Sequence, residues 1–188
     1  MSYYRQQLED WLKTLDVKAG TVLDIGGAQG QVKNRVRSWD VREYAVYDIE
    51  SEVENGNARV LIDLDDPFYL DNFEPRADLI FCLEVFEYLI NPLNGLRVIE
   101  SLLMPSAKAY ITFAFVYPHH NELDRDSLRY TEPGIRRLAA AAGLKVSNVL
   151  YREDQSGYLE KFYESDGMRA AKQYAHHDAT GFIVEFQK

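Results

Sequence analysis

Short apolar segments alternate with helical patterns along most of the chain. Seven segments of four to seven residues are rich in Val, Ile, Leu and aromatic side chains, which is the composition of buried strands. We expect these strands at residues 21–25, 44–47, 59–62, 77–83, 109–115, 145–150 and 182–186. Apolar residues at helical spacing predict an amphipathic helix within residues 1–19 and further helices at residues 31–38, 93–103 and 132–142.

The order of these elements predicts how they assemble. Strands that alternate with helices form a parallel sheet covered on both faces, because each helix returns the chain to the same end of the sheet. Residues 152–180 join the last two strands, and we expect a helix at residues 167–175 within them. A connection of this length is typical of a functional loop. The sequence thus predicts a single α/β domain, residues 1–188, with an insertion or lid at residues 152–180.

Composition narrows the class of protein further. The chain has 188 residues, 46% of them hydrophobic, which suits one domain with a substantial core. Its single cysteine, Cys82, lies in an apolar run and can form neither an internal disulfide nor a thiolate zinc site. No apolar run approaches the roughly 20 residues of a membrane span, and the N-terminus lacks a signal-peptide pattern. We therefore expect a soluble, cytoplasmic protein without a membrane partner.

The net charge of the chain argues against nucleic acid as a partner. Lys and Arg total 21 against 30 for Asp and Glu, so the net charge is −9. Such a chain repels the phosphate backbone of nucleic acids unless its basic residues cluster on one surface. Bulk nucleic acid is therefore not an expected partner.

Three glycines, Gly26, Gly27 and Gly30, follow the first predicted strand. Glycines at such a turn let a ligand approach the backbone, and ligands of α/β sheets bind at the carboxyl edge of the strands. A dinucleotide-binding turn has the spacing G-x-G-x-x-G, whose first glycine is replaced here by Ile25. The carboxylate of Asp24 would repel a pyrophosphate and attract a ligand with ammonium and sulfonium groups, such as S-adenosylmethionine. An ordinary tight turn is the alternative.

From residue 21 to residue 150 the chain resembles the Rossmann-like (class I) S-adenosylmethionine-dependent methyltransferases, of the type that acts on small molecules and in glycan pathways. The resemblance rests on five segments in order: Asp24 with Gly26 and Gly30, Asp48 after the second strand, Asp63 after the third, residues 77–92 around the fourth, and Tyr117-Pro118-His119-His120 with residues 126–131. It implies a doubly wound seven-stranded sheet, mostly parallel with an antiparallel last strand, and helices on both faces.

The resemblance also implies which residues hold S-adenosylmethionine and its product S-adenosylhomocysteine. Asp48 would accept hydrogen bonds from the ribose hydroxyls, while Asp63 and the backbone N–H of Leu64 would bind the adenine. Ala28 stands where many members of the family have the middle glycine. The expected cofactor-binding residues are Asp24, Gly26, Gly27, Gly30, Asp48, Ile49, Asp63, Leu64, Leu83 and Glu84.

Two histidines are the candidate catalytic residues. His119 and His120 follow the fifth strand, where the resemblance places acceptor-side residues, and an imidazole is a suitable base for a hydroxyl acceptor near neutral pH. Glu84 and Glu87 could ligate a cation together with a neighbouring histidine, but Tyr88 stands at that position, so we expect no metal.

Asp126 and Arg129 belong to the last of the five segments. Their side chains would either orient the acceptor by hydrogen bonding or pair with each other at the entry to the predicted helix at residues 132–142. The residues leave both roles open.

The expected function is methyl transfer from S-adenosylmethionine to a small-molecule acceptor, with an oxygen of a sugar or related metabolite as the target. Ala28 and Tyr88 motivate an alternative, a non-catalytic module that binds a cofactor or a partner on the same fold. A nicotinamide-dependent oxidoreductase is a third reading, disfavoured by Asp24. The sequence leaves the oligomeric state open.

Overall fold

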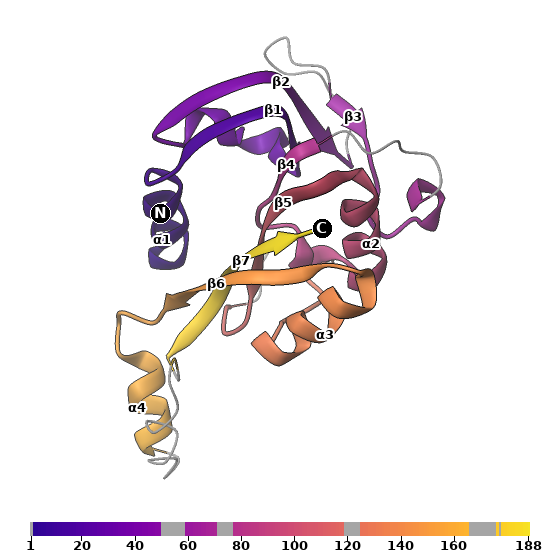
Figure 1. The fold of residues 1–188 in the computed structure, drawn as a ribbon. Coiled ribbons are helices and arrows are strands. Elements are labelled where there is room, and N and C mark those ends of the chain that lie inside the picture. Colours follow the sequence, from indigo (N-terminus) through magenta and orange to yellow (C-terminus); the bar gives the residue numbers. More distant parts are fainter. Residues whose placement is uncertain (1, 50–58, 71–76, 119–124, 166–175, 177) are drawn as a thin grey trace.

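The computed structural model describes residues 2–49, 59–70, 77–118, 125–165, 176 and 178–188. Its centre is a seven-stranded sheet with the strand order β3-β2-β1-β4-β5-β7-β6 (Figure 1). Strand β7 runs antiparallel to β5 and β6, and the other neighbouring strands are parallel. The strands are β1 (Asp16–Ile25), β2 (Ser38–Asp48), β3 (Arg59–Leu61), β4 (Ala77–Cys82), β5 (Leu103–Ala114), β6 (Lys145–Glu153) and β7 (Ala179–Gln187). This arrangement confirms the predicted Rossmann-like sheet and its antiparallel last strand.

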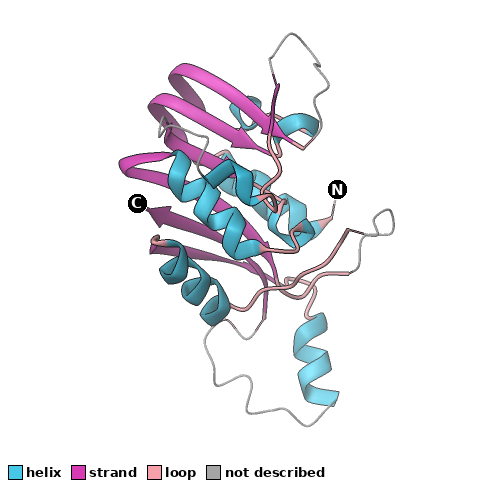
Figure 2. Cartoon of the chain, turned by 90° about the vertical axis from the view of Figure 1, so that its right-hand side faces the viewer, coloured by secondary structure: helices cyan, strands magenta, loops and turns pink. Residues whose placement is uncertain are grey.

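Helices cover both faces of the sheet, as predicted (Figures 1 and 2). Helices α2 (Pro92–Leu102) and α3 (Glu132–Ala142) pack over one face and share the larger core with Ile80, Ile111 and Val184. Helix α1 (Tyr3–Leu12) covers the other face through Leu8 and Leu12. The buried Cys82 belongs to the larger core, which confirms that it packs as a small apolar side chain.

Local sequence signals set the ends of helices α2 and α3. Asn91 caps α2 by accepting a hydrogen bond from the backbone of Asn94, and Pro92 occupies the first turn. Thr131 caps α3, which ends at Gly143 in the left-handed conformation, φ 82°. The observed α3 has the predicted bounds because both of its end signals are local.

The predicted helices at residues 31–38 and 1–19 need correction. Residues 32–34 form only a 3₁₀ turn, and β2 begins at Ser38, because Ser38 pairs with Asp16 on β1 and is therefore part of the sheet. Helix α1 ends at Leu12, and β1 begins at Asp16, where the chain pairs with Ser38 on β2 instead of continuing the helix. Both differences come from the pairing of β1 with β2, whose residues are distant in the sequence.

The connection between β6 and β7 contains α4 (Tyr158–Ser165), which the sequence pattern did not predict. Asp154 begins this helix by accepting hydrogen bonds from the backbone N–H groups of Ser156 and Leu159. The helix predicted at residues 167–175 lies outside the described residues. Within the described part of the chain, no helix has the length and apolar character that crossing a membrane requires.

Candidate active site

The parallel strands bring most of the predicted cofactor residues to one edge of the sheet. Ile25, the last residue of β1, pairs with Tyr47 on β2 and with Cys82 on β4, and Asp48 pairs with Leu61 on β3. The residues that follow these strands therefore lie at the carboxyl edge, where ligands of α/β sheets bind. The predicted residues assembled there are Gly26, Gly27, Asp48, Ile49, Asp63, Leu64, Leu83 and Glu84.

The glycine turn has two positions that accept only glycine. Gly26 has φ 78°, and a Cβ atom there would lie 2.3 Å from the Cγ2 atom of Val85. A Cβ atom on Gly27 would lie 2.4 Å from the Cγ atom of Asp24. Gly30 differs, since no described atom lies within 4 Å of its Cβ position. Contacts with Val85 and Asp24 therefore exclude side chains at Gly26 and Gly27, whereas Gly30 faces open space.

The buried side chain of Asp24 holds the chain next to the glycine turn in place. Its carboxyl oxygen Oδ2 accepts hydrogen bonds from the backbone N–H of Val32 at 2.8 Å and from the Tyr44 hydroxyl at 2.6 Å. Burial raises the pKa of Asp24 to about 6, although these two hydrogen bonds oppose the shift. Tyr44 is a residue that the sequence pattern did not single out. A direct contact between Asp24 and the cofactor remains a prediction.

Asp48 and its neighbours fit a nucleoside. The two carboxyl oxygens of Asp48 accept hydrogen bonds from the backbone N–H groups of Ala28 and Ile49, and a carboxylate can accept about four, so capacity remains for a ribose diol. The side chains of Ile49 and Leu61 are about half exposed, at 49% and 51%. Two exposed apolar side chains beside a polar acceptor suit a flat base attached to a sugar. The arrangement fits the nucleoside part of S-adenosylmethionine.

Two predicted residues beyond β3 have contacts within the protein. The Asp63 carboxylate accepts a hydrogen bond from the backbone N–H of Asp65. Leu64 is buried, and its carbonyl oxygen accepts a hydrogen bond from the side chain of Asn94 on α2. These bonds fix the turn at the predicted adenine position. Binding of the adenine by Asp63 and by the Leu64 N–H remains a prediction.

Glu84 is held by a buried guanidinium at the end of β4. Its Oε1 atom lies 2.7 Å from Nη1 of Arg152, whose side chain is 1% exposed. The same guanidinium donates from Nε and Nη2 to the carbonyl oxygen of Tyr4 and lies over the Tyr4 ring. Glu84 has φ 58°, a strained backbone for a residue with a side chain, and its N–H donates to the Thr112 hydroxyl. Arg152 thus joins α1, β4 and β6 at one point, and no sequence motif had indicated it.

Glu87 lies in the same polar cluster as Glu84 and Arg152, and its side chain is buried. It is 2% exposed, and its Oε2 atom has no hydrogen-bond partner among the described residues. Burial and, to a smaller extent, the nearby charge of Glu84 raise the pKa of Glu87 to about 8, while Arg152 and Arg129 oppose the shift. Glu87 therefore keeps its proton at neutral pH.

This protonation makes stability depend on pH in a defined direction. The pKa of Glu87 in the folded protein lies above its ordinary value, so the folded state binds the proton more tightly than the unfolded state does. The stability from this proton is complete below the ordinary value of 4.5 and is lost as pH rises toward 8. We expect the free energy of unfolding to fall between about pH 5 and about pH 8 by about 3 kcal/mol more in the parent protein than in Glu87→Gln.

Urea denaturation at several pH values measures this difference. Glu164→Gln, which changes an exposed glutamate on α4, is the matched control and should keep the parent profile. Parallel profiles for the parent protein and Glu87→Gln would contradict the assignment of a protonated Glu87.

A pocket of about 740 Å³ lies next to this cluster. The first turn of α1 contributes Tyr3 and Tyr4, the chain after β5 contributes residues 116–118, and residues 153–159 close the remaining side. Tyr4 is shared between the pocket and the Arg152 contact, so the pocket adjoins the carboxyl edge where Glu84 lies. Its volume falls within the range of about 300–1,000 Å³ that is typical of small-molecule sites.

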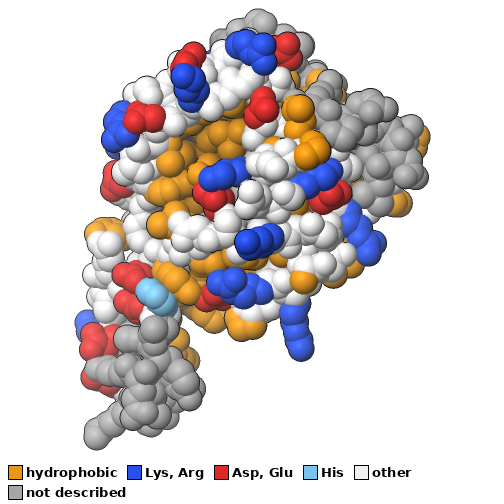
Figure 3. Space-filling model, viewed as in Figure 1, with side chains coloured by type: hydrophobic (Ala, Val, Ile, Leu, Met, Phe, Trp, Pro, Cys, Tyr) orange, Lys and Arg blue, Asp and Glu red, His pale blue; other side chains and the backbone are white. Residues whose placement is uncertain are grey.

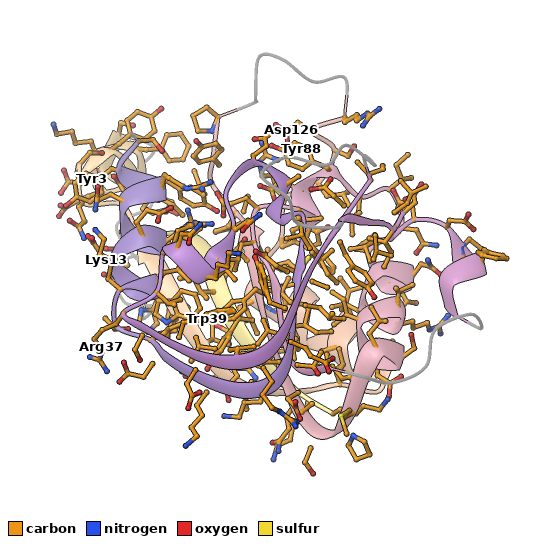
Figure 4. All side chains as sticks on the ribbon, turned by 90° about the horizontal axis from the view of Figure 1, so that it is seen from above. Tyr3, Lys13, Arg37, Trp39, Tyr88 and Asp126 are labelled. Carbon is orange, nitrogen blue, oxygen red and sulfur yellow. The ribbon has the colours of Figure 1, made fainter. Side chains whose placement is uncertain are left out.

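Asp126 and Arg129 pair with each other in the structure. Two hydrogen bonds of 2.6 and 2.8 Å join their side chains, and Arg129 also donates to the carbonyl oxygens of Tyr117 and Pro118. Figure 4 shows Asp126 beside Tyr88. The pair therefore holds the chain that leads to His119.

Two predictions about catalysis are left untested by the geometry. His119 and His120 lie outside the described residues. Within the described residues, no group of three or more His, Cys, Asp or Glu side chains could hold a metal ion.

Comparisons with known proteins identify this architecture. Residues 1–149 match the protein family described as a methyltransferase domain, and no curated protein matches the chain. Solved structures with the same fold include the [4+2]-cyclase SpnF, with a TM-score of 0.63 and 16% identity over 97% of this chain and 80% of that one.

Two further structures are named as methyltransferases. One is the 1,6-didemethyltoxoflavin-N1-methyltransferase of Burkholderia thailandensis with bound S-adenosylhomocysteine, with a TM-score of 0.62 and 14% identity over 91% of this chain and 72% of that one. The other is an S-adenosylmethionine-dependent methyltransferase of Archaeoglobus fulgidus, with a TM-score of 0.64 and 13% identity over 99% and 92%. At these identities the likeness shows a common fold.

The sheet order and the residues at its carboxyl edge define a Rossmann-like methyltransferase. The chain belongs to the methyltransferase domain family, and one of the solved structures with this fold holds S-adenosylhomocysteine.

Proposed function

We propose that this enzyme transfers the methyl group of S-adenosylmethionine to an oxygen of a small-molecule acceptor, a sugar or a related metabolite. The 740 Å³ pocket carries the proposal, because its wall residue Tyr4 shares the Arg152 guanidinium with Glu84 at the carboxyl edge and because it has the volume of a metabolite site. A cytoplasmic location and the lack of a nucleic-acid partner remain predictions from composition.

The bound cofactor supplies a methyl group already activated by its sulfonium charge. The protein therefore has to hold the acceptor in line, exclude water and remove the hydroxyl proton. The tyrosines of the pocket, Tyr3, Tyr4 and Tyr117, offer apolar faces that exclude water. His119 and His120 directly follow the wall formed by residues 116–118 and are the proposed proton acceptors.

Calorimetric titration with S-adenosylmethionine and with S-adenosylhomocysteine tests the proposal without knowledge of the acceptor. Binding of both ligands, followed by mass-spectrometric detection of a methylated hydroxyl compound from a metabolite mixture, supports it. The alternative is a non-catalytic module, which Ala28 and Tyr88 motivate. That alternative predicts weak or absent binding of both ligands.

Asp48 gives the sharpest test of the cofactor site. We expect Asp48→Ala to weaken the binding of S-adenosylhomocysteine by about 1–3 kcal/mol, because ribose hydroxyls would lose a charged acceptor. Asp40→Ala is the matched control, since Asp40 lies on the same strand with an exposed side chain far from the carboxyl edge. Unchanged affinity in Asp48→Ala would remove Asp48 from the ribose site.

A further inference from the structure

The charged side chains among the described residues that line the acceptor pocket are acidic. Glu153 and Asp154 are the charged side chains among the described residues that line it, and no described Lys or Arg does so. Tyr3, Tyr4 and Tyr158 lie on the surrounding walls. Figure 3 shows mainly acidic side chains on the described surface around α4. A pocket with carboxylates and tyrosine rings attracts cations and repels anions.

Hydrogen bonds hold the carboxylate of Asp154 and the backbone of Glu153 in place. Burial raises the pKa of Asp154, but hydrogen bonds from Ser156 and from the N–H of Leu159 outweigh burial and lower it below its usual value. The backbone of Glu153 is held by two hydrogen bonds with the side chain of Gln7 on α1, at 2.8 and 2.9 Å. Its own carboxylate is 45% exposed and so remains accessible from the pocket.

Two basic side chains near the pocket, Arg152 and His176, leave part of the Glu153 carboxylate open. The guanidinium of Arg152 is buried and directed toward Glu84 and the Tyr4 carbonyl. The His176 ring approaches one oxygen of Glu153 at 3.3 Å, and the other oxygen has no such contact in the described structure. One face of Tyr4 is covered by Arg152, whereas Tyr3 and Tyr158 are 59% and 67% exposed. A second cation can therefore contact these rings and the Glu153 carboxylate.

We propose that the acceptor pocket selects small molecules that carry a protonated amine, with Glu153 as the residue that determines this specificity. The inference rests on the proposed function, since it assigns this pocket to the methyl acceptor. Acceptors that carry a carboxylate or a phosphate are excluded by the same charges.

Three matched probes test the selectivity: tyramine, tyrosol and 4-hydroxyphenylacetate, which share a phenol and end in an amine, a hydroxyl and a carboxylate. Their dissociation constants are measured by NMR titration of the full-length protein saturated with S-adenosylhomocysteine, and again without it. We expect tyramine to bind about tenfold more tightly than 4-hydroxyphenylacetate, with tyrosol between them. Glu153→Gln should remove most of the preference for tyramine and leave tyrosol unchanged, whereas Glu160→Gln on α4 should keep it.

The outcomes separate this inference from the proposed function. Equal affinity for the three probes, preference for 4-hydroxyphenylacetate, or no binding of tyramine at millimolar concentration overturns the amine selectivity. An unchanged preference in Glu153→Gln overturns the role of Glu153. Failure of S-adenosylhomocysteine to bind, with the preference for tyramine intact, overturns the methyl-transfer proposal and leaves the selectivity of the pocket standing.

Discussion

Replacing Arg152 with Met is expected to lower the free energy of unfolding by about 3–5 kcal/mol, the usual cost of removing one partner from a buried ion pair. Arg152 is 1% exposed and is the shared donor to Glu84 and to the Tyr4 carbonyl. Without it, the Glu84 carboxylate would lose its charge partner, the Tyr4 carbonyl would lose the hydrogen bonds from the guanidinium, and Glu84 would lose a contact that supports its strained backbone. Urea denaturation at neutral pH measures the loss.

Arg136 provides the matched control for this experiment. It forms an ion pair with Glu132 one helical turn away, and its side chain is 51% exposed. Pairs of this kind contribute about 0–1 kcal/mol, so Arg136→Met should be close to the parent protein. Equal, small losses in both variants would contradict the structural role assigned to Arg152. Arg152→Lys should recover part of the stability, because an ammonium can still donate to Glu84.

The second large effect is expected in turnover. Removing a general base slows proton transfer by about 10²–10⁴-fold, so His119→Ala or His120→Ala should lower turnover by about that factor. Both residues follow Pro118, whose carbonyl oxygen is held by Arg129. The base would therefore be attached to a fixed point of the pocket wall. The measurement is the rate of methyl transfer at saturating S-adenosylmethionine.

Cofactor affinity supplies the control for the histidine variants. Since the predicted base acts on the acceptor, titration of either variant with S-adenosylhomocysteine should match the parent protein. Two variants with full turnover would remove the general-base hypothesis. A variant that loses turnover and cofactor binding together would indicate a structural role instead.

The cofactor edge could be predicted because its signals are local and repeated. Each of Gly26, Asp48, Asp63 and Glu84 lies at or just beyond the end of an apolar run, and parallel strands place those ends together. The α4 side of the pocket gave a weaker signal, since only the length of residues 152–180 indicated a functional loop there. Helix α4 has only eight residues and begins at a cap formed by Asp154, inside a stretch of mixed charges and tyrosines.

Sequence by itself determined the class of fold and the strand ends at which the predicted cofactor residues lie, because hydrophobic periodicity and glycine turns act over a few residues. Only the tertiary structure showed that Arg152, Glu84 and Glu87 form a polar cluster. Arg152 reaches the carbonyl oxygen of Tyr4 across 148 positions of sequence, and the burial of Glu87 follows from that packing. Such contacts depend on how distant elements meet in space, so no local pattern encodes them, and they raise the pKa of Glu87.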